Sequence, residues 1–222
     1  MNRLFEGVPA HGLVLLALFG AALIAAPYLV SNYVLSVLII VLYFAYVGQA
    51  WNIMLGFAGA LSLGHALFVG IGAYASAALF IKYGIPPLIG MFVSIALSVA
   101  VGCMIGYLGF RFSIHGVYFA LLTIAFAEFT GIMVDHTRWL GGTEGLFLPV
   151  ANRDRVDLVN LRGSPVMFYY VILAMTALAL ALCRILLNSK LGYYWQAIRE
   201  DQQAAEATGV HLFKYKMIAV AI

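Results

Sequence analysis

The chain has 222 residues, of which 64 % are hydrophobic and only 9 % are charged, and its mean hydropathy is +1.01. This composition excludes an ordinary soluble domain, and a formal net charge of +3 scattered along the chain does not favour a nucleic-acid partner. Cys103 and Cys183 both fall in apolar runs, where a small buried hydrophobe is more typical than a disulfide or a metal pair. We therefore predict an all-α, polytopic integral membrane protein.

Six apolar runs have about the length that a helix needs to cross a bilayer, roughly 20 residues. In chain order they are residues 12–30, 33–55, 66–81, 86–108, 116–134 and 166–187. A seventh run begins near Met217 and the sequence stops at Ile222, so we expect six complete spans, the start of a seventh, and a C-terminally incomplete chain. The first run is long for a signal peptide, which favours an uncleaved span over a cleaved signal.

The positive charges predict which ends of the spans face the cytoplasm. If the N-terminus with Arg3 is inside, seven of the 12 Lys and Arg are inside, and most of the others share one longer outer loop with acidic residues. The positive-inside rule therefore favours a cytoplasmic N-terminus. We predict one transmembrane domain over residues 1–222, with two longer connections, an outer one at 135–165 and an inner one at 188–213.

Small residues are concentrated between the second and third spans, at residues 48–77. Small residues four apart, such as Gly56, Ala60 and Gly64, allow close helix packing in lipid. The alternative is an interrupted or re-entrant segment at residues 56–65, a backbone that membranes tolerate only where protein or a watery path satisfies it. Both interpretations stay open. In the second, the candidates to line a path are Asn52, Gly56, Gly59, Ser62, Gly64 and His65.

Glu128 is the one acidic residue well inside a predicted span, where a charge costs about 2.5–3.5 kcal/mol. The favoured interpretation is a packing residue that is hydrogen-bonded with help from Thr123 or Thr130. The alternatives are a group on a path through the membrane and a contact with a partner subunit. The sequence has no phosphate-binding loop, zinc motif or nucleophile elbow, and its five histidines are scattered, so we predict neither an enzyme nor a metal site.

The segment LGYYWQAIREDQQAAEATGVHLFKYK, residues 191–216, is polar and carries charges of both signs. Residues 193–208 are good helix formers, and we predict one helix there with its apolar side chains along one side. The segment is too polar to span a membrane. Its expected boundary residues are Asn188 or Ser189 as the first cap, Gly192 as a turn away from the sixth span, and Gly209 as the C-terminal glycine.

Three blocks of sequence, taken together and in order, resemble a known family. They are LGFAGALSLGHALFVGIGAYASA at 55–77, GVYFALLTIAFAE at 116–128 followed by GGTEGL at 141–146, and the polar segment at 191–216. The family is that of the permease subunits of branched-chain amino acid ABC importers, of the LivM type within the LivH/LivM family. The resemblance covers most of the chain and implies a transport function.

The resemblance makes the polar segment a coupling helix, which docks on an ATP-binding subunit and carries an EAA-xxx-G pattern. Here the pattern reads Gln203, Ala204, Ala205 and Gly209, so that a glutamine replaces the leading glutamate of the family. The docking role and the helix are expected to persist without a salt bridge from position 203. The residues that this implies for docking are Ile198, Arg199, Glu200, Asp201, Ala204, Ala205, Glu206 and Gly209.

The resemblance also implies partners in a bacterial inner membrane. They are two ATP-binding subunits, a second related permease subunit and a periplasmic binding protein that delivers branched-chain or related amino acids. ATP is then bound by the partners, and no cofactor is expected in this chain. The outer loop would face the binding protein through Arg138, Trp139, Glu144, Arg153 and Arg155. The competing hypothesis is a carrier that acts alone and is driven by an ion or proton gradient.

Overall fold

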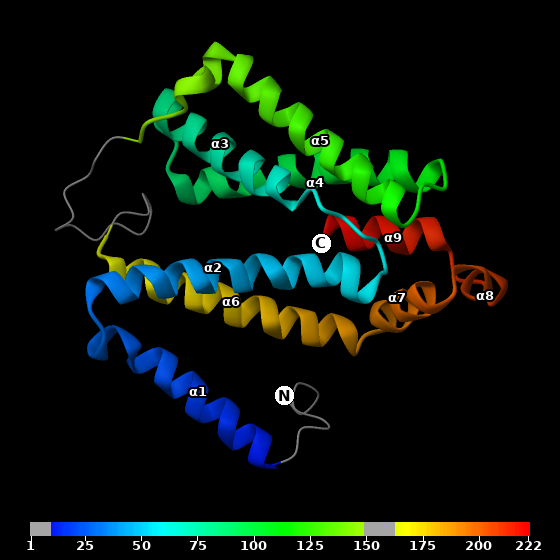
Figure 1. The fold of residues 1–222 in the computed structure, drawn as a ribbon, viewed down its shortest axis with the longest axis horizontal. Helices are drawn as coiled ribbons and strands as arrows, with labels where there is room; N and C mark the ends of the chain where they lie inside the picture. The colour runs from blue at the N-terminus through cyan, green and yellow to red at the C-terminus, as the bar shows by residue number, and fades with distance from the viewer. Residues whose placement is uncertain (1–9, 149–162) are drawn as a thin grey trace. The chain divides into compact units, whose positions relative to one another are not determined.

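The computed structural model describes residues 10–148 and 163–222. All the regular structure in these two ranges is helical, which confirms the predicted all-α class. The chain forms two compact units (Figure 1). The first comprises Met1–Ala50 and Gly163–Tyr193, and the second comprises Trp51–Arg162 and Tyr194–Ile222.

The predicted spans coincide with helices. In chain order these are α1 (Ala10–Leu29), α2 (Asn32–Asn52), α3 (His65–Tyr83), α4 (Pro87–Arg111), α5 (Val117–His136) and α6 (Pro165–Leu187). The last five are long and apolar enough to cross a membrane, and α1 contributes a shorter apolar stretch, Val14–Leu29. The apolar run near Met217, predicted as the start of a seventh span, falls within α9 (Leu212–Ala221). The protein is therefore a multi-pass α-helical membrane protein.

In the first unit, α6 lies beside α2 and contacts α1 (Figure 1). Pro27 lies inside α1, and because proline has no N–H, the carbonyl of Leu23 four residues earlier lacks its helical donor. The hydroxyl of Tyr169 on α6 donates to that oxygen at 2.7 Å. Tyr169 is completely buried and packs with Leu35 and Leu42 of α2. One tyrosine thus replaces the missing backbone bond of one helix and fills the contact with another.

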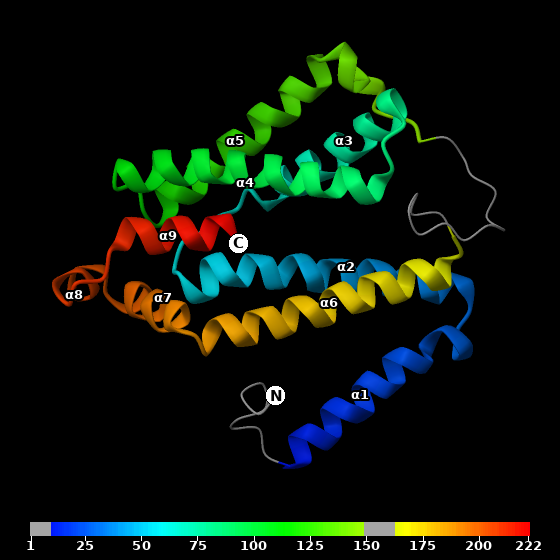
Figure 2. The same cartoon turned by 180° about the vertical axis from the view of Figure 1, so that it is seen from behind.

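In the second unit, α4 packs against α3, α5 and α9 (Figure 2). Glycines on α4 allow these close approaches. At Gly109 an added Cβ would meet the ring of Phe119 on α5, and at Gly106 it would meet Met217 and Val220 of α9. The Ser94 hydroxyl donates to the carbonyl of Gly72 on α3 at 3.1 Å. In this unit helix contacts therefore depend on small residues, as is usual where lipid removes the hydrophobic drive for association.

The helix is interrupted between α2 and α3. A π-helix (Ile53–Phe57) follows α2, and residues 58–64 have no regular structure before α3 begins at His65. Gly56, Ala60 and Gly64 therefore do not line one helix face, and the helix-packing interpretation is wrong for them. The interrupted segment proposed as its alternative is present. We call residues 53–64 the break segment.

Candidate functional site

The polar segment forms two helices before α9, α7 (Lys190–Glu200) and α8 (Gln202–Ala207), so the prediction of one helix over 193–208 is wrong. Asp201 stands between them with extended backbone, and its carboxylate accepts from the N–H groups of Gln203 at 2.8 Å and Ala204 at 3.1 Å. An aspartate competes with the helical backbone in this way because its side chain satisfies the free donors of a new helix start. Asp201 is therefore the N-cap of α8.

Replacing Asp201 by alanine is expected to destabilise α8 by about 0.5–2 kcal/mol, because two backbone donors lose their acceptor. Amide hydrogen exchange at Gln203 and Ala204 should then be faster by roughly three- to thirtyfold. Asp201→Asn is the matched control, because its side-chain oxygen can still cap the helix. Unchanged exchange in Asp201→Ala would show that the cap does not stabilise α8.

The C-terminal end of α8 is formed as predicted by Gly209, whose φ is +89°. Its N–H donates to the carbonyl of Glu206 at 2.9 Å, and the N–H of Val210 donates to that of Ala205 at 3.1 Å. This pair of bonds is a Schellman motif, and its usual hydrophobic contact is present because Val210 packs on Ala205.

The start of α7 is capped by Ser189, whose hydroxyl accepts from the N–H of Gly192 at 3.4 Å. Gly192 itself lies inside α7 and is not the turn that the sequence predicted. A Cβ at this position would collide with the carbonyl oxygens of Leu186 and Leu187. Gly192 is therefore needed because α7 folds back against the last turn of α6.

One side of the helix pair is fixed to α9. Trp195 and Ile198 are completely buried, and the indole N–H of Trp195 donates to the carbonyl of Tyr215 at 2.8 Å. The rings of Tyr194 and Tyr215 are also in contact, with centroids 4.6 Å apart and planes tilted by 40°. Ile198 and Ala205 belong to one buried cluster, so these two members of the predicted docking set point inward. The predicted apolar side of the segment is confirmed.

The other side of the helix pair is exposed. The exposed members of the predicted docking set are Arg199, Glu200, Asp201, Ala204, Glu206 and Gly209, and Gln203 is exposed with them. Acidic groups prevail among these seven residues, since Arg199 is paired with Glu200 at 2.7 Å. The helix pair thus has an exposed polar side, while its opposite side is buried against α9.

The break segment carries most of the predicted path residues. Ser62 is almost completely buried, and neither its hydroxyl oxygen nor Nδ1 of His65 has a hydrogen-bond partner in the described parts of the chain. Asn52 is half-buried at the end of α2. The indole N–H of Trp51 donates to the Ser62 carbonyl at 2.7 Å, and the Leu63 N–H donates to the Thr123 hydroxyl on α5 at 3.1 Å. The break segment is thus anchored on both sides, while the Ser62 hydroxyl within it and Nδ1 of His65, directly after it, stay unpaired among the described residues.

The glycines of the break segment are positions of close contact. A Cβ at Gly56 would collide with the side chain of Asn52, and one at Gly64 would collide with the backbone of Thr123. Gly59 has a φ of +66° and lies against Arg199. At Gly56 the Asn52 side chain could move aside, whereas at Gly59 and Gly64 a larger side chain would meet backbone atoms, so the path of the segment depends on glycine at these two positions.

Glu128 is exposed on α5, roughly 17 Å along the helix from Val117. The favoured interpretation, a packing carboxylate supported by threonine, is wrong for the described residues. The Thr130 hydroxyl donates to the carbonyl of Phe126, and that of Thr123 donates to the carbonyl of Ala120. Both threonines bond to their own helix, as threonines in helices commonly do. The path and partner-subunit interpretations of Glu128 remain predictions.

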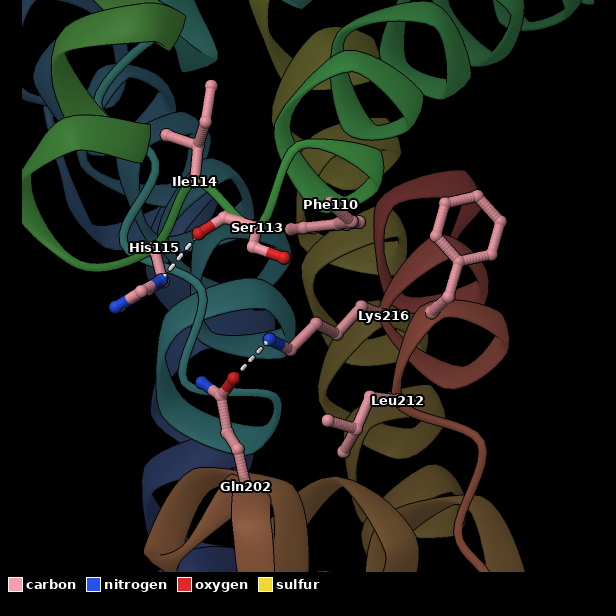
Figure 3. A pocket seen from close by; sticks show the side chains of 8 residues that line it. Phe110, Ser113, Ile114, His115, Gln202, Leu212 and Lys216 are labelled. Atoms are coloured by element: carbon pink, nitrogen blue, oxygen red, sulfur yellow. Dashed lines mark hydrogen bonds between the residues drawn. The ribbon is translucent and has the colours of Figure 1, made fainter. Parts of the chain in front are cut away.

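A hollow of about 90 Å³ lies beside the helix pair (Figure 3). Side chains from the end of α4, the following turn, α8 and α9 line it, and Lys216 donates to the side-chain oxygen of Gln202 across it at 2.8 Å. Its volume equals that of about three water molecules, which is too small for a drug-sized ligand. The bond from Lys216 to Gln202 is a second hydrogen bond between the helix pair and α9, after that of Trp195 with Tyr215.

The candidates for a binding-protein contact, Arg138, Trp139 and Glu144, lie in two short 3-10 helices after α5, Arg138–Leu140 and Gly142–Glu144. All three are exposed, and the Lys82 ammonium at the end of α3 lies 4.4 Å from the Trp139 ring centroid. This cation–π contact holds the loop against α3. The other two candidates, Arg153 and Arg155, are outside the described residues.

Comparison with known proteins identifies the family. A family model described as "Branched-chain amino acid transport system / permease component" matches residues 33–222. The LivM permease proteins of the high-affinity branched-chain amino acid transport systems of Escherichia coli (strain K12) and Salmonella typhimurium (strain LT2) are each 28 % identical to the chain. The matches cover 90 % and 95 % of this chain but only 51 % and 54 % of the relatives, so the chain spans about half the length of the curated relatives it matches. No solved structure gives a significant match. The chain belongs to the family of permease components of branched-chain amino acid transport systems.

Proposed function

We propose that this chain is the membrane-spanning part of a permease subunit in an ATP-driven ABC importer, which moves branched-chain or related amino acids from periplasm to cytoplasm. It works in the bacterial inner membrane with its N-terminus in the cytoplasm. Its partners are two ATP-binding subunits, a second related permease subunit and a periplasmic substrate-binding protein. The names of the curated relatives and the family match support this proposal.

The observation that carries the proposal is the two-sided character of the α7–α8 helix pair. Trp195, Ile198 and Ala205 bury its inner side, while the exposed side of α8 carries polar and small residues. A helix pair that is firmly attached to α9 and exposed on its other side can transmit a push from a soluble subunit. A merely solvated loop would not require a completely buried tryptophan.

The mechanism follows from this attachment. Closure of the ATP-binding subunits on ATP moves the exposed side of α8, and the buried contacts of Trp195 with Tyr215 carry that motion to α9. A rigid-body tilt of the attached spans then switches the path from outward to inward opening. The chain itself performs no catalysis in this scheme and binds no ATP or other cofactor.

The amino acid path is assigned to the break segment and its neighbours. Asn52, Ser62 and His65 supply polar groups there, and the unpaired atoms of Ser62 and His65 fit a hydrated lining. Glu128 is assigned to the path or to the contact with the second permease subunit. At the outer end, Arg138, Trp139 and Glu144 are assigned to the contact with the binding protein.

The full-length protein, purified gently in detergent, is expected to retain an ATP-binding subunit. Uptake into liposomes reconstituted with these partners should require ATP and survive loss of the ion gradients. The competing carrier hypothesis is favoured by one observation, the exposed carboxylate of Glu128 within a span. A carrier predicts the reverse result, in which uptake collapses with the gradient and continues without any ATP-binding subunit.

A further inference from the structure

Arg199 makes its hydrogen bonds inside the protein. Its Nη1 donates to the carbonyl oxygen of Gly56, in the break segment, at 2.6 Å. Its Nη2 and Nε both donate to Oε1 of Glu200, at 2.7 and 3.2 Å. The guanidinium therefore joins a carbonyl 143 residues away in the sequence to the acidic end of α7.

The carbonyl of Gly56 requires a donor because the helix ends there. The chain leaves the π-helix after Phe57, and the N–H of Ala60 turns back to the carbonyl of Met54 at 2.9 Å instead of to Gly56. A charged donor suits this oxygen, since charge-assisted hydrogen bonds are shorter and stronger than neutral ones. The exposed pair of Arg199 with Glu200 contributes little stability by itself, and its effect is to orient the guanidinium.

Gly59 adds a second contact between the same two segments. An added Cβ at Gly59 would lie 3.1 Å from Cα and 3.0 Å from Cγ of Arg199, so the two backbones are closely packed. Three residues further on, Ser62 is held by Trp51, and Leu63 is held by Thr123 of α5. The end of α7 is thus continuous, through hydrogen bonds and packing, with the segment that leads into α3.

We propose that Arg199 is a positioning residue that joins the α7–α8 helix pair to the break segment, and is not a contact for the ATP-binding subunit. When the helix pair moves, Arg199 pulls on the Gly56 carbonyl and shifts the break segment, which carries Ser62 and leads directly into His65. The inference rests on the proposed function and deepens it, because it adds a second route from α8 into the membrane besides α9. The proposal also divides the predicted docking set. Glu206 and Ala204, on the exposed side of α8, are left for the contact with the ATP-binding subunit.

The test uses the full-length importer, reconstituted in liposomes with its ATP-binding subunits. In Arg199→Met, which keeps most of the apolar stem of the side chain and removes the guanidinium, the ATP-binding subunits should be retained and ATP hydrolysis should continue. The amount of amino acid taken up per ATP should fall about tenfold, the effect of losing one charge-assisted bond. Arg199→Lys should restore uptake in part, because an ammonium can reach the carbonyl but cannot also bridge to Glu200.

Two further variants separate positioning from docking. Glu200→Gln leaves the arginine in place but weakens its orientation, so it should lower uptake per ATP by about threefold. If Arg199→Met does not accumulate, the uptake per ATP of Glu200→Gln tests the proposal instead. Glu206→Lys changes the exposed side of α8, and it should instead reduce retention of the ATP-binding subunits.

The proposal is overturned if Arg199→Met loses its ATP-binding subunits as Glu206→Lys does, or if its uptake per ATP equals that of the wild type. Failure of the proposed function has a different signature. In that case the wild-type protein itself retains no ATP-binding subunit, and its uptake does not depend on ATP.

Discussion

Replacement of Trp195 by alanine is expected to destabilise the second unit strongly. The side chain is completely buried, and its N–H satisfies the carbonyl of Tyr215. Truncating a buried tryptophan costs about 3–5 kcal/mol, because a cavity is left where the packing cannot fully relax. Thermal unfolding in detergent, followed by size-exclusion chromatography, should show the loss as a lower midpoint temperature. Protease cleavage between α7 and α9 should become faster.

Two controls separate the causes of this loss. Trp195→Phe keeps most of the ring volume and removes the N–H, so its cost should be about 1–3 kcal/mol, the penalty for an unsatisfied carbonyl. Tyr193→Ala truncates an exposed neighbour and should leave the midpoint unchanged. A midpoint for Trp195→Ala equal to that of Tyr193→Ala would contradict the packing of α7 on α9.

Gly209→Pro is expected to abolish coupled uptake while the protein stays inserted in the membrane. Gly209 has a φ of +89°, whereas proline fixes φ near −65° and removes the N–H that donates to Glu206. Proline cannot adopt this φ, so the turn that ends α8 cannot form, and the loss of the turn together with its hydrogen bond is enough to unwind a helix of six residues. Uptake and ATP hydrolysis should be measured on the same liposomes, and we expect hydrolysis to continue without uptake.

Gly209→Asn is the matched variant, since asparagine adopts the left-handed conformation more readily than other residues with a side chain. It should retain most of the coupled uptake. Amide exchange at Val210 should be fast in the proline variant and close to wild type in the asparagine variant. Normal uptake by Gly209→Pro would show that the end of α8 has no part in coupling.

The sequence was a good guide where the determining signal is local. The apolar runs predicted the helices, and Gly209 and Ser189 predicted two helix ends, because caps and glycines act over three or four residues. The separation of α7 from α8 at Asp201 also has a local cause, the side-chain cap of Asp201. It was not predicted because good helix formers lie on both sides of this residue. Helix propensity differs by only tenths of a kcal/mol per residue, so one good N-cap is enough to override it.

Contacts between distant residues were missed because no periodic pattern encodes them. Thr123 anchors Leu63 across 60 residues, and Arg199 reaches Gly56 across 143. Both threonines expected to support Glu128 bond to their own helix instead, a choice that depends on side-chain rotamers. The interrupted helix between α2 and α3 remained one of two alternatives, since glycines serve close packing and broken backbone equally well.

The pairing of Pro27 with Tyr169 has a consequence for how this fold can evolve. The hydroxyl of Tyr169 compensates for a donor that proline lacks, so the cost of losing either residue depends on whether the other is present. A lineage that replaces Pro27 with a residue bearing an N–H no longer requires the hydroxyl, and phenylalanine then becomes acceptable at position 169. The reverse order of substitution passes through a chain with an orphaned carbonyl in lipid. Epistasis therefore gives this pair a preferred direction of change, with the proline lost first.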